Sequence, residues 1–484
     1  MDERINKLGN AKKLIEDKQF LQAEQLLNNY LSLYPDDRDG LHLLGIVFQS
    51  REEFEKAIYY YRKCLDINSN NPEILKNIGL SLMGMRLFEK AIEIFKVAIE
   101  ITPQNVKLHN NLAVLYDLTG NFEKAKESFY RAIELDSNYW EAYQNLSHTY
   151  SYLGDLDKAE YYNEKALMLN PDSVDANFDR AIIKLNKGDF PAAWKEYEWR
   201  LKKDLIGFKN FSKPRLIDQP VQDKTVVVYD EQGFGDTIQF VRFIPLLKQK
   251  CCKIVLMTHE KLVDLMVNSN VAETVLPKKD GSYNFEYDYH IPLLSIPYYL
   301  GIKEEDIPKN LPYLFVDEKL IVSKSKLFKS CEKLKVGTVW RGKQPIGNEH
   351  RTASLKDYIK LSSIPVIQLY SLQADTLTGE EKELLKENKI IDLSREIRNF
   401  YNTAAVMMNL DLIITIDTYS AHLAGALGKE VWTLLSFKSD WRWKSVNDVS
   451  IWYPGMKLFK QYKFGEWQPV FERVYNNLLL YIND

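Results

Sequence analysis

The chain is poor in cysteine and lacks long apolar runs. Only four of its 484 residues are cysteines, and apart from one adjacent pair they are scattered along the sequence. This pattern is neither a disulfide framework nor the spacing of a metal site. No apolar stretch approaches the roughly 18 residues that span a bilayer, and the opening MDERINKLGNAKKL has no signal-peptide core. We expect a cytoplasmic protein without a transmembrane segment.

A strong net charge is also missing. The formal net charge is -3, with 27% charged and 45% hydrophobic residues, which is ordinary for a globular protein. No basic field therefore points to nucleic acid as a partner. A chain of this length can form about two to four domains with full cores.

The first 207 residues carry a repeat with a period of 34. Alanine recurs six times at this interval, and a large apolar or aromatic residue follows four positions after five of the six alanines. Such a period is typical of tetratricopeptide repeats, which are paired antiparallel helices that stack into a superhelix. The small side chain lets two helices approach closely. We predict about six repeats over residues 1–207, with these alanines: Ala23, Ala57, Ala91, Ala125, Ala159 and Ala193.

A row of polar side chains follows the same period. Asn77, Asn111 and Asn145 lie one repeat apart on the first helix of consecutive repeats, and Asp179 continues the row. Two roles stay open. An Asn amide offers a donor and an acceptor, which suits the backbone of an extended peptide, so the row would hold a protein acceptor in the superhelix. Alternatively, each Asn forms hydrogen bonds only within its own helix pair.

The second half has a different pattern. After residues 208–224, which we interpret as a linker or docking segment, eight short β-rich runs alternate with helical ones from Thr225 onward. This alternation predicts parallel sheets with crossover helices. We predict an α/β fold of two Rossmann-like lobes, residues 225–325 and 326–484, following the all-α superhelix. A ligand would bind between the lobes, at the carboxyl ends of the strands.

Two glycines and an aspartate follow the first of these strands. Gly233 and Gly235 permit a tight turn, and Asp236 stands where a helix begins. Aspartate is a common N-cap residue, but a carboxylate in the cleft can also act as a general base. The sequence leaves both roles open.

Three further loops face the predicted cleft. Residues 340–343 and 350–352 offer three cations and a hydroxyl, which suit a diphosphate because arginine can bind its oxygens in bidentate fashion. Ser371 and Gln373 would border a nucleobase or ribose. Residues 417–422 open a helix whose free N–H groups and dipole favour an anion. The sequence therefore predicts a nucleotide-diphosphate site.

Taken in order, these loops resemble those of the heptosyltransferase-like transferases of glycosyltransferase family 9, which have the GT-B fold. The resemblance covers about Thr225 to Val474. The segments that carry it are EQGFGDTIQFVRFIPLL (231–247), GTVWRG (337–342), HRTASL (350–355), LYSLQ (369–373), TAAVMMNLDLIITIDTYSAHLAGALGKEVWTLL (403–435) and DWRW (440–443).

The resemblance implies an inverting, metal-independent glycosyltransferase that uses a nucleotide-sugar donor and no other cofactor. Asp236 matches the family's catalytic base, and residues 417–422 match the site of the donor phosphates. Asn402 departs from the family, because many relatives have an acidic residue there. His422 can also be a buried core histidine. The expected donor-site residues are Gly233, Gly235, Gln239, Trp340, Lys343, His350, Arg351, Thr352, Ser371, Gln373, Asp417, Thr418, Tyr419, Ser420, Ala421 and His422.

Repeats fused to such a transferase also resemble, in architecture, the O-linked N-acetylglucosamine transferases and bacterial flagellin glycosyltransferases, which modify Ser or Thr of proteins. We therefore expect sugar transfer to a protein held by the repeats. A lipid-linked or surface glycan as acceptor, and a non-catalytic scaffold with a degenerate transferase domain, stay open as alternatives, as does a homo-oligomer. The aromatic-rich segment 190–200 should dock on the transferase half.

Overall fold

The protein forms two compact units. The structure is a computed structural model that describes residues 2–203, 211–250, 253–278, 285–328, 332–342 and 349–483. Contacts between residues divide the chain into Met1–Pro171 and Asp172–Asp484. The division falls before the predicted end of the repeats at residue 207, so the last repeat helices belong to the second unit. Each unit is described by itself.

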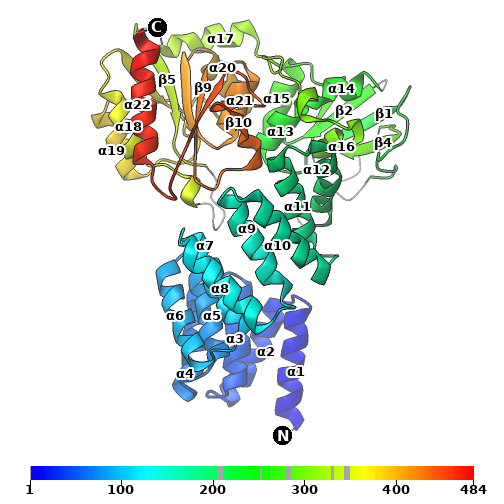
Figure 1. The fold of residues 1–484 in the computed structure, drawn as a ribbon, viewed down its shortest axis with the longest axis vertical. Coiled ribbons are helices and arrows are strands. Elements are labelled where there is room, and N and C mark those ends of the chain that lie inside the picture. The colour runs from blue at the N-terminus through cyan, green and yellow to red at the C-terminus, as the bar shows by residue number, and fades with distance from the viewer. Residues whose placement is uncertain are drawn as a thin grey trace. The chain divides into compact units, whose positions relative to one another are not determined.

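The first unit is a helical array in which consecutive helices pack as pairs (Figure 1). Its described residues form α1 (Asp2–Glu16), α2 (Phe20–Leu33), α3 (Arg38–Ser50), α4 (Phe54–Ile67), α5 (Pro72–Gly84), α6 (Phe88–Ile101), α7 (Val106–Leu118), α8 (Phe122–Leu135), α9 (Trp140–Tyr152) and α10 (Leu156–Leu169).

The 34-residue period follows from how these helices pack. All six repeat alanines are fully buried, and so is the residue four positions after each one. A second small position explains the glycines, because a Cβ at Gly79 would lie only 2.6 Å from Cε2 of Phe95. Gly45 has the same relation to Tyr61. The aromatic ring of one helix thus fills the space left by the glycine of its partner helix.

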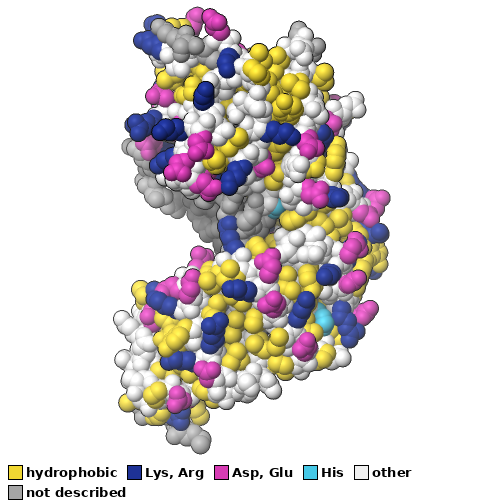
Figure 2. Space-filling model, turned by 90° about the vertical axis from the view of Figure 1, so that its left-hand side faces the viewer, with side chains coloured by type: hydrophobic (Ala, Val, Ile, Leu, Met, Phe, Trp, Pro, Cys, Tyr) yellow, Lys and Arg dark blue, Asp and Glu magenta, His cyan; other side chains and the backbone are white. Residues whose placement is uncertain are grey.

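Helix starts follow the same period. Asp37, Asn71 and Asn105 are the N-caps of α3, α5 and α7, and each accepts a hydrogen bond from a backbone N–H in the first helical turn. Tyr139, one period later, makes no side-chain cap. On the face drawn in Figure 2, charged side chains of both signs are interspersed with hydrophobic ones over these repeats.

The second unit begins with two more helices of the repeat type. These are α11 (Val174–Lys187) and α12 (Phe190–Tyr197), and a short 3-10 helix follows at Glu198–Lys202. Trp194 of α12 is buried and donates from Nε1 to the carbonyl of Ile302, 2.9 Å away. The ring of Trp194 also packs edge-to-face on Trp441, with 5.8 Å between centroids. The predicted docking of this segment on the α/β part is therefore present in the structure.

The rest of the unit contains two sheets. The first has the order β3-β2-β1-β4, with every neighbouring pair parallel. The second has the order β10-β11-β12-β9-β8-β5-β6-β7, parallel from β12 to β7 and antiparallel at the β10-β11 end. The strands are β1 (Thr225–Tyr229), β2 (Lys253–Thr258), β3 (Thr274–Pro277), β4 (Tyr289–Pro292), β5 (Leu334–Val339), β6 (Ile367–Ser371), β7 (Ile391–Asp392), β8 (Leu412–Ile416), β9 (Val431–Leu435), β10 (Ser445–Val446), β11 (Val449–Ser450) and β12 (Met456–Lys460).

Helices cover the sheets and complete the core (Figure 1). The mixed α/β architecture predicted for this half is confirmed, and its parallel sheets are consistent with the expected pair of lobes. None of the helices in the described ranges has the length and apolar character needed to cross a membrane. The helices are α13 (Phe234–Phe240), α14 (Ile244–Lys248), α15 (Glu260–Asn268), α16 (Ile296–Leu300), α17 (Glu318–Ser325), α18 (Leu355–Ser362), α19 (Gly379–Glu387), α20 (Phe400–Met408), α21 (Tyr419–Ala426) and α22 (Gln468–Asn483).

Candidate functional site

A cavity of about 580 Å³ lies where the two sheets of the second unit present the carboxyl ends of their strands. Its walls come from the segments after β1, β2 and β3 in one sheet and after β5, β6 and β8 in the other. This is the position that the sequence predicted for a ligand. The described lining residues are Asp230, Gln232, Gly233, Phe234, Gly235, His259, Lys278, Val339, Arg341, Gly342, Arg351, Thr352, Gln373, Ala374, Asp375, Ile416, Asp417, Thr418 and Tyr419.

One wall is organised by Asp230, the residue after β1. Its carboxylate is buried and accepts hydrogen bonds from the hydroxyl of Thr258 at 2.7 Å and the backbone N–H of His259 at 2.9 Å. The ammonium of Lys278, just beyond β3, lies 3.0 Å from the same carboxylate. Because β1, β2 and β3 are parallel, their carboxyl ends bring these groups together. Asp230 thus fixes a cation in the cavity wall.

The segment from Asp230 to Gly235, called the glycine loop below, follows β1 and leads into α13. Gly233 and Gly235 line the cavity. A Cβ at Gly235 would lie 2.9 Å from Cδ2 of His422, so the absence of a side chain lets α13 and α21 meet.

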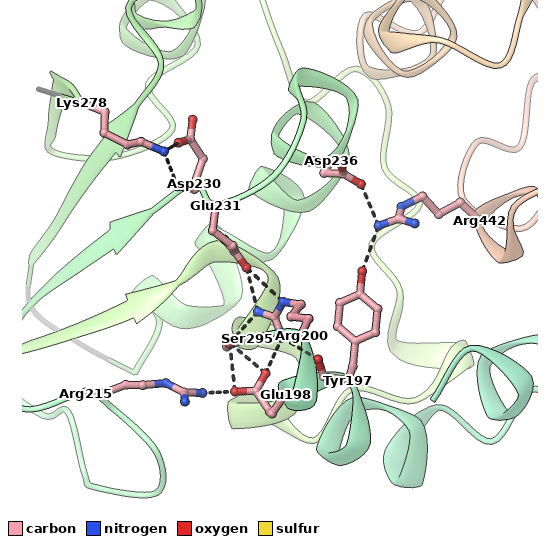
Figure 3. A network of polar contacts seen from close by, with 10 residues as sticks. All are labelled: Tyr197, Glu198, Arg200, Arg215, Asp230, Glu231, Asp236, Lys278, Ser295 and Arg442. Atoms are coloured by element: carbon pink, nitrogen blue, oxygen red, sulfur yellow. Dashed lines mark hydrogen bonds and ion pairs between the residues drawn. The ribbon is translucent and has the colours of Figure 1, made fainter. Parts of the chain in front are cut away.

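Asp236 has the environment of both a helix cap and a charged site. One carboxylate oxygen accepts a hydrogen bond from the backbone N–H of Gly233 at 3.1 Å. The other oxygen lies 2.7 Å from the guanidinium of Arg442 (Figure 3). The side chain is 22% exposed, although it is outside the described cavity lining. Gly233 is the N-cap of α13, so Asp236 is not the N-cap itself; it lies in the first helical turn and its carboxylate binds back to the N-cap backbone. The role of general base stays a prediction.

The opposite wall pairs Arg351 with Asp417. The two side chains form an ion pair at the start of the loop after β8. Burial raises the pKa of Asp417 above its ordinary value, although Arg351 opposes this. Thr418 is the N-cap of α21 and accepts a hydrogen bond from the N–H of Ser420 at 3.3 Å. A half-buried cation and the start of a helix thus face the same cavity, which suits an anion.

Arg341 is a second cation on this wall, and it is also paired. Its guanidinium lies 2.6 Å from Glu381, whose carboxylate also accepts from Nε1 of Trp340 at 2.8 Å. Gln373 donates to the carbonyl of Arg341 at 3.0 Å. A Cβ on Gly342 would lie 2.9 Å from Thr418. The loop after β5 is therefore locked against the loops after β6 and β8.

Aromatic rings border the cavity between the two walls. Phe234 lies 4.8 Å from the ring of His259 and 4.7 Å from Phe400, which in turn meets Tyr419 edge-to-face at 4.9 Å. Phe234, His259 and Tyr419 all line the cavity. Such rings can stack on a nucleobase.

The predicted donor residues fall into three groups. The structure brings eight of them to the cavity lining, namely Gly233, Gly235, Arg351, Thr352, Gln373, Asp417, Thr418 and Tyr419. Six are buried outside the described lining, namely Gln239, Trp340, Ser371, Ser420, Ala421 and His422. His350 stacks on Phe464 at 5.4 Å, and Lys343 lies outside the described residues.

His422 has the surroundings of a core histidine. Its ring is buried, stacks on Trp443 with 4.8 Å between centroids, and shares a 3.1 Å hydrogen bond with the hydroxyl of Tyr453. Burial, followed by Arg442 and Arg242, lowers its pKa to about 3. The ring is thus kept neutral inside the protein.

Some cavity residues were missing from the sequence prediction. Phe234, His259 and Lys278 line the cavity, and each follows an apolar strand closely in the sequence. That position is the signal that could have identified them, because the carboxyl ends of parallel strands meet at one edge. Asn402, the departure from the family pattern, donates to Asn399, the N-cap of α20.

Two residues of the predicted acceptor row contact neighbouring helices. The amide of Asn77 lies 2.9 Å from Nε2 of His42, and that of Asn145 donates to Asn110 at 3.0 Å. Asp179 is buried and Asn111 is half-buried. Asn77 and Asn145 therefore join first helices of successive repeats, and their role in holding a peptide stays a prediction. In the described residues, three or more potential metal-ligating side chains do not cluster.

Comparisons with known proteins identify the repeats. Models of the tetratricopeptide repeat match residues 41–73, 72–105, 106–139 and 128–161, so the chain contains tetratricopeptide repeats, as predicted. Protein FlbA of Caulobacter vibrioides is 23% identical over 344 residues, which cover 64% of this chain and 56% of FlbA. The match thus spans little more than half the length of that relative.

Some similar solved structures cover about two fifths of the chain. PilW, a type IV pilus biogenesis factor, is 20% identical, with a TM-score of 0.38 over 43% of this chain and 96% of PilW. Pseudomonas aeruginosa pilF is also 20% identical, with a TM-score of 0.37 over 42% of this chain and 93% of pilF. At such TM-scores these likenesses carry no argument about function.

Proposed function

We propose that the chain is an inverting glycosyltransferase that moves a sugar from a nucleotide-sugar donor to Ser or Thr of a protein held by its repeats. One observation carries the proposal: Arg351, the glycine loop and the start of α21 converge on one cavity at the carboxyl ends of the parallel strands of two sheets. The tetratricopeptide repeats support interaction with a protein partner.

The cavity offers complementary groups for each part of the donor. Phe234 and Tyr419 present rings to a nucleobase, and Gln373, whose amide is bonded to the backbone of Arg341, fixes the loop beside them. The diphosphate would lie against Arg351 and the N–H groups that open α21. Arg351 is already oriented by Asp417, so little rearrangement is needed when the phosphates arrive. Preorganised positive groups of this kind stabilise charge that develops during a reaction.

In the proposed reaction, the acceptor hydroxyl attacks the anomeric carbon and loses its proton to the carboxylate of Asp236. The bond from that carbon to the phosphate oxygen breaks, and the nucleotide leaves with the bonding electrons. Arg351 and the start of α21 stabilise the departing diphosphate, a task that a divalent metal performs in other enzymes. Attack from the face opposite the leaving group inverts the anomeric centre.

Donor binding is tested by thermal unfolding of the full chain with ADP, UDP, GDP, CMP and their common sugar conjugates. A ligand at a hundred times its dissociation constant should add about 2.7 kcal/mol to the free energy of unfolding. Arg351→Gln should abolish the shift, whereas Arg473→Gln, which removes an arginine on α22 outside the described lining, should preserve it. A flat response across the whole panel would favour the scaffold alternative.

Acceptor chemistry is tested by intact-mass analysis of candidate proteins co-expressed with the chain. A sugar-sized mass gain on a protein is expected. A gain confined to glycan or lipid fractions would show that the acceptor is a glycan or a lipid-linked glycan instead of a protein. Asp236→Asn should lower turnover by about a hundred- to ten-thousand-fold while nucleotide binding persists. Unchanged turnover would remove Asp236 from the reaction.

A further inference from the structure

The short 3-10 helix that follows α12, Glu198–Lys202, reaches the beginning of the glycine loop. The guanidinium of Arg200, whose side chain is 2% exposed, lies 2.7 Å from the carboxylate of Glu231, which is fully buried. The same nitrogen donates to the hydroxyl of Ser295 at 2.8 Å. Glu198 binds Arg200 from the other side at 2.7 Å and pairs with Arg215 (Figure 3). The loop that follows β1 is therefore anchored to the repeat segment by a buried charge network.

A second contact from the same segment reaches the far end of that loop. Tyr197, the last residue of α12, is buried, and its hydroxyl accepts a hydrogen bond from Nη2 of Arg442 at 3.1 Å. The same nitrogen lies 2.7 Å from Oδ1 of Asp236. Figure 3 shows Arg442 between the phenol and the carboxylate. One guanidinium nitrogen thus joins the repeat helix to the candidate base.

The surroundings of Arg442 restrict where its guanidinium can go. It lies 4.5 Å from the centroid of the Trp441 ring, and Nη1 donates to Asp440 at 3.0 Å. Trp441 itself packs edge-to-face on Tyr197, with 6.2 Å between centroids. A planar guanidinium held by stacking and by several hydrogen bonds cannot be replaced by a flexible ammonium without losing geometry.

We propose that Arg442 is a positioning residue for the carboxylate of Asp236, and that Tyr197 at the end of the repeat array fixes Arg442 in turn. The inference rests on the proposed function for its catalytic meaning, because it assigns Asp236 as the group to be placed. Its consequence is that the last repeat helix is part of the site, in addition to any part the array plays in holding an acceptor.

The direct test is the structure of variants of the full chain, determined by crystallography without ligand. Tyr197→Phe removes one hydroxyl and keeps the packed ring. Arg442→Lys keeps the positive charge but loses the planar guanidinium with its several N–H donors. In both variants the Asp236 carboxylate should leave the position that it holds between Gly233 and residue 442. Tyr462→Phe is the matched control, since its hydroxyl accepts a 3.0 Å hydrogen bond from Arg473 at the surface. A carboxylate that stays in place in both variants overturns the proposal.

Kinetics then separate this inference from the proposed function. With the sugar conjugate that stabilises the wild-type protein, Arg442→Lys should lower kcat by about a hundred-fold, and Tyr197→Phe should lower it by less. Both should bind the parent nucleotide with unchanged affinity. If the carboxylate moves in the variants but the wild-type chain transfers sugar from no conjugate in the panel, the proposed function fails and the positioning stands. If the carboxylate moves and kcat is unchanged, the catalytic meaning is overturned.

Discussion

Different kinds of internal contact stabilise each of the two compact units. In Met1–Pro171 a close contact between a glycine and a ring recurs one repeat later and joins residues close in the sequence, as Tyr61 does with Gly45 and Phe95 with Gly79. In Asp172–Asp484 a few buried charges join distant segments, and the Arg442–Tyr197 hydrogen bond spans 245 positions. A repeat array therefore spreads its stability over many equivalent contacts, whereas the second unit depends on individual buried groups.

The largest effect should come from a buried charge left alone. Arg200→Met leaves the fully buried Glu231 unpaired, which should destabilise the second unit by about 3–5 kcal/mol. The matched change in the first unit is Arg51→Met, because Arg51 is 29% exposed and its two partners, Glu24 and Glu53, are each 26% exposed. Such a pair contributes at most about 1 kcal/mol. Hydrogen exchange, followed by mass spectrometry on peptides of each unit, measures the destabilisation caused by each variant. Equal destabilisation by the two variants would contradict the proposed difference between the units.

A buried histidine should make the second unit sensitive to acid. Burial lowers the pKa of His422 to about 3 from an ordinary value of 6.5, so the unfolded chain takes up this proton more readily than the folded one. Its stabilising contribution is complete above pH 6.5 and is lost as the pH falls toward 3. Between pH 6 and pH 4 the loss should be about 1.4 kcal/mol per pH unit.

His422→Asn should remove that slope. Tryptophan fluorescence during urea unfolding reports mainly on this unit, since eight of the nine tryptophans lie in residues 172–484. His290, whose pKa burial lowers to about 4, contributes a slope that the wild-type and variant proteins share. His109→Asn, at a half-buried histidine of the repeats whose ring bonds to the carbonyl of Pro103, is the control. An identical pH dependence in the wild-type protein and His422→Asn would contradict the assignment.

Filling a glycine gap should damage the repeats locally. Gly79→Val forces a side chain into the ring of Phe95, and overpacking of this kind costs about 1–3 kcal/mol. Gly9→Val is the control, because a Cβ there has open space around it. Exchange should accelerate in peptides of α5 and α6 and stay unchanged in the second unit. Loss of protection throughout the chain would show that the repeats are less independent than their contacts indicate.

The smallest effect should come from a helix cap. Asn105 accepts hydrogen bonds from the N–H groups of Lys107 at 3.1 Å and Leu108 at 3.4 Å. Asn105→Ala should therefore cost about 1 kcal/mol, measured as faster exchange at the start of α7. Asn121 is the N-cap of α8 but makes no side-chain cap, so Asn121→Ala should cost less. A larger effect at Asn121 would contradict the cap assignment.

Sequence prediction succeeded where the information is local. The 34-residue period identified the helix pairs because small and aromatic residues must meet at fixed positions in every repeat. Apolar runs such as Leu412–Ile416 identified strands because a parallel strand covered on both faces is hydrophobic throughout. The eight predicted runs omitted β4 (Tyr289–Pro292) and β12 (Met456–Lys460), which are recognised by their pairing with β1 and β9. They also omitted the two-residue strands β10 and β11.

The sequence by itself determined the repeat array, the α/β class of the second half and the loops that meet at its strand ends, because each depends on patterns within a few residues. Only the tertiary structure decided which side chains of those loops line the cavity and which, such as Trp340 and His422, are buried behind it. It also decided that Tyr197, Arg442 and Asp236 meet. Charges from distant segments become partners only when folding removes them together from water, and no local pattern records that event.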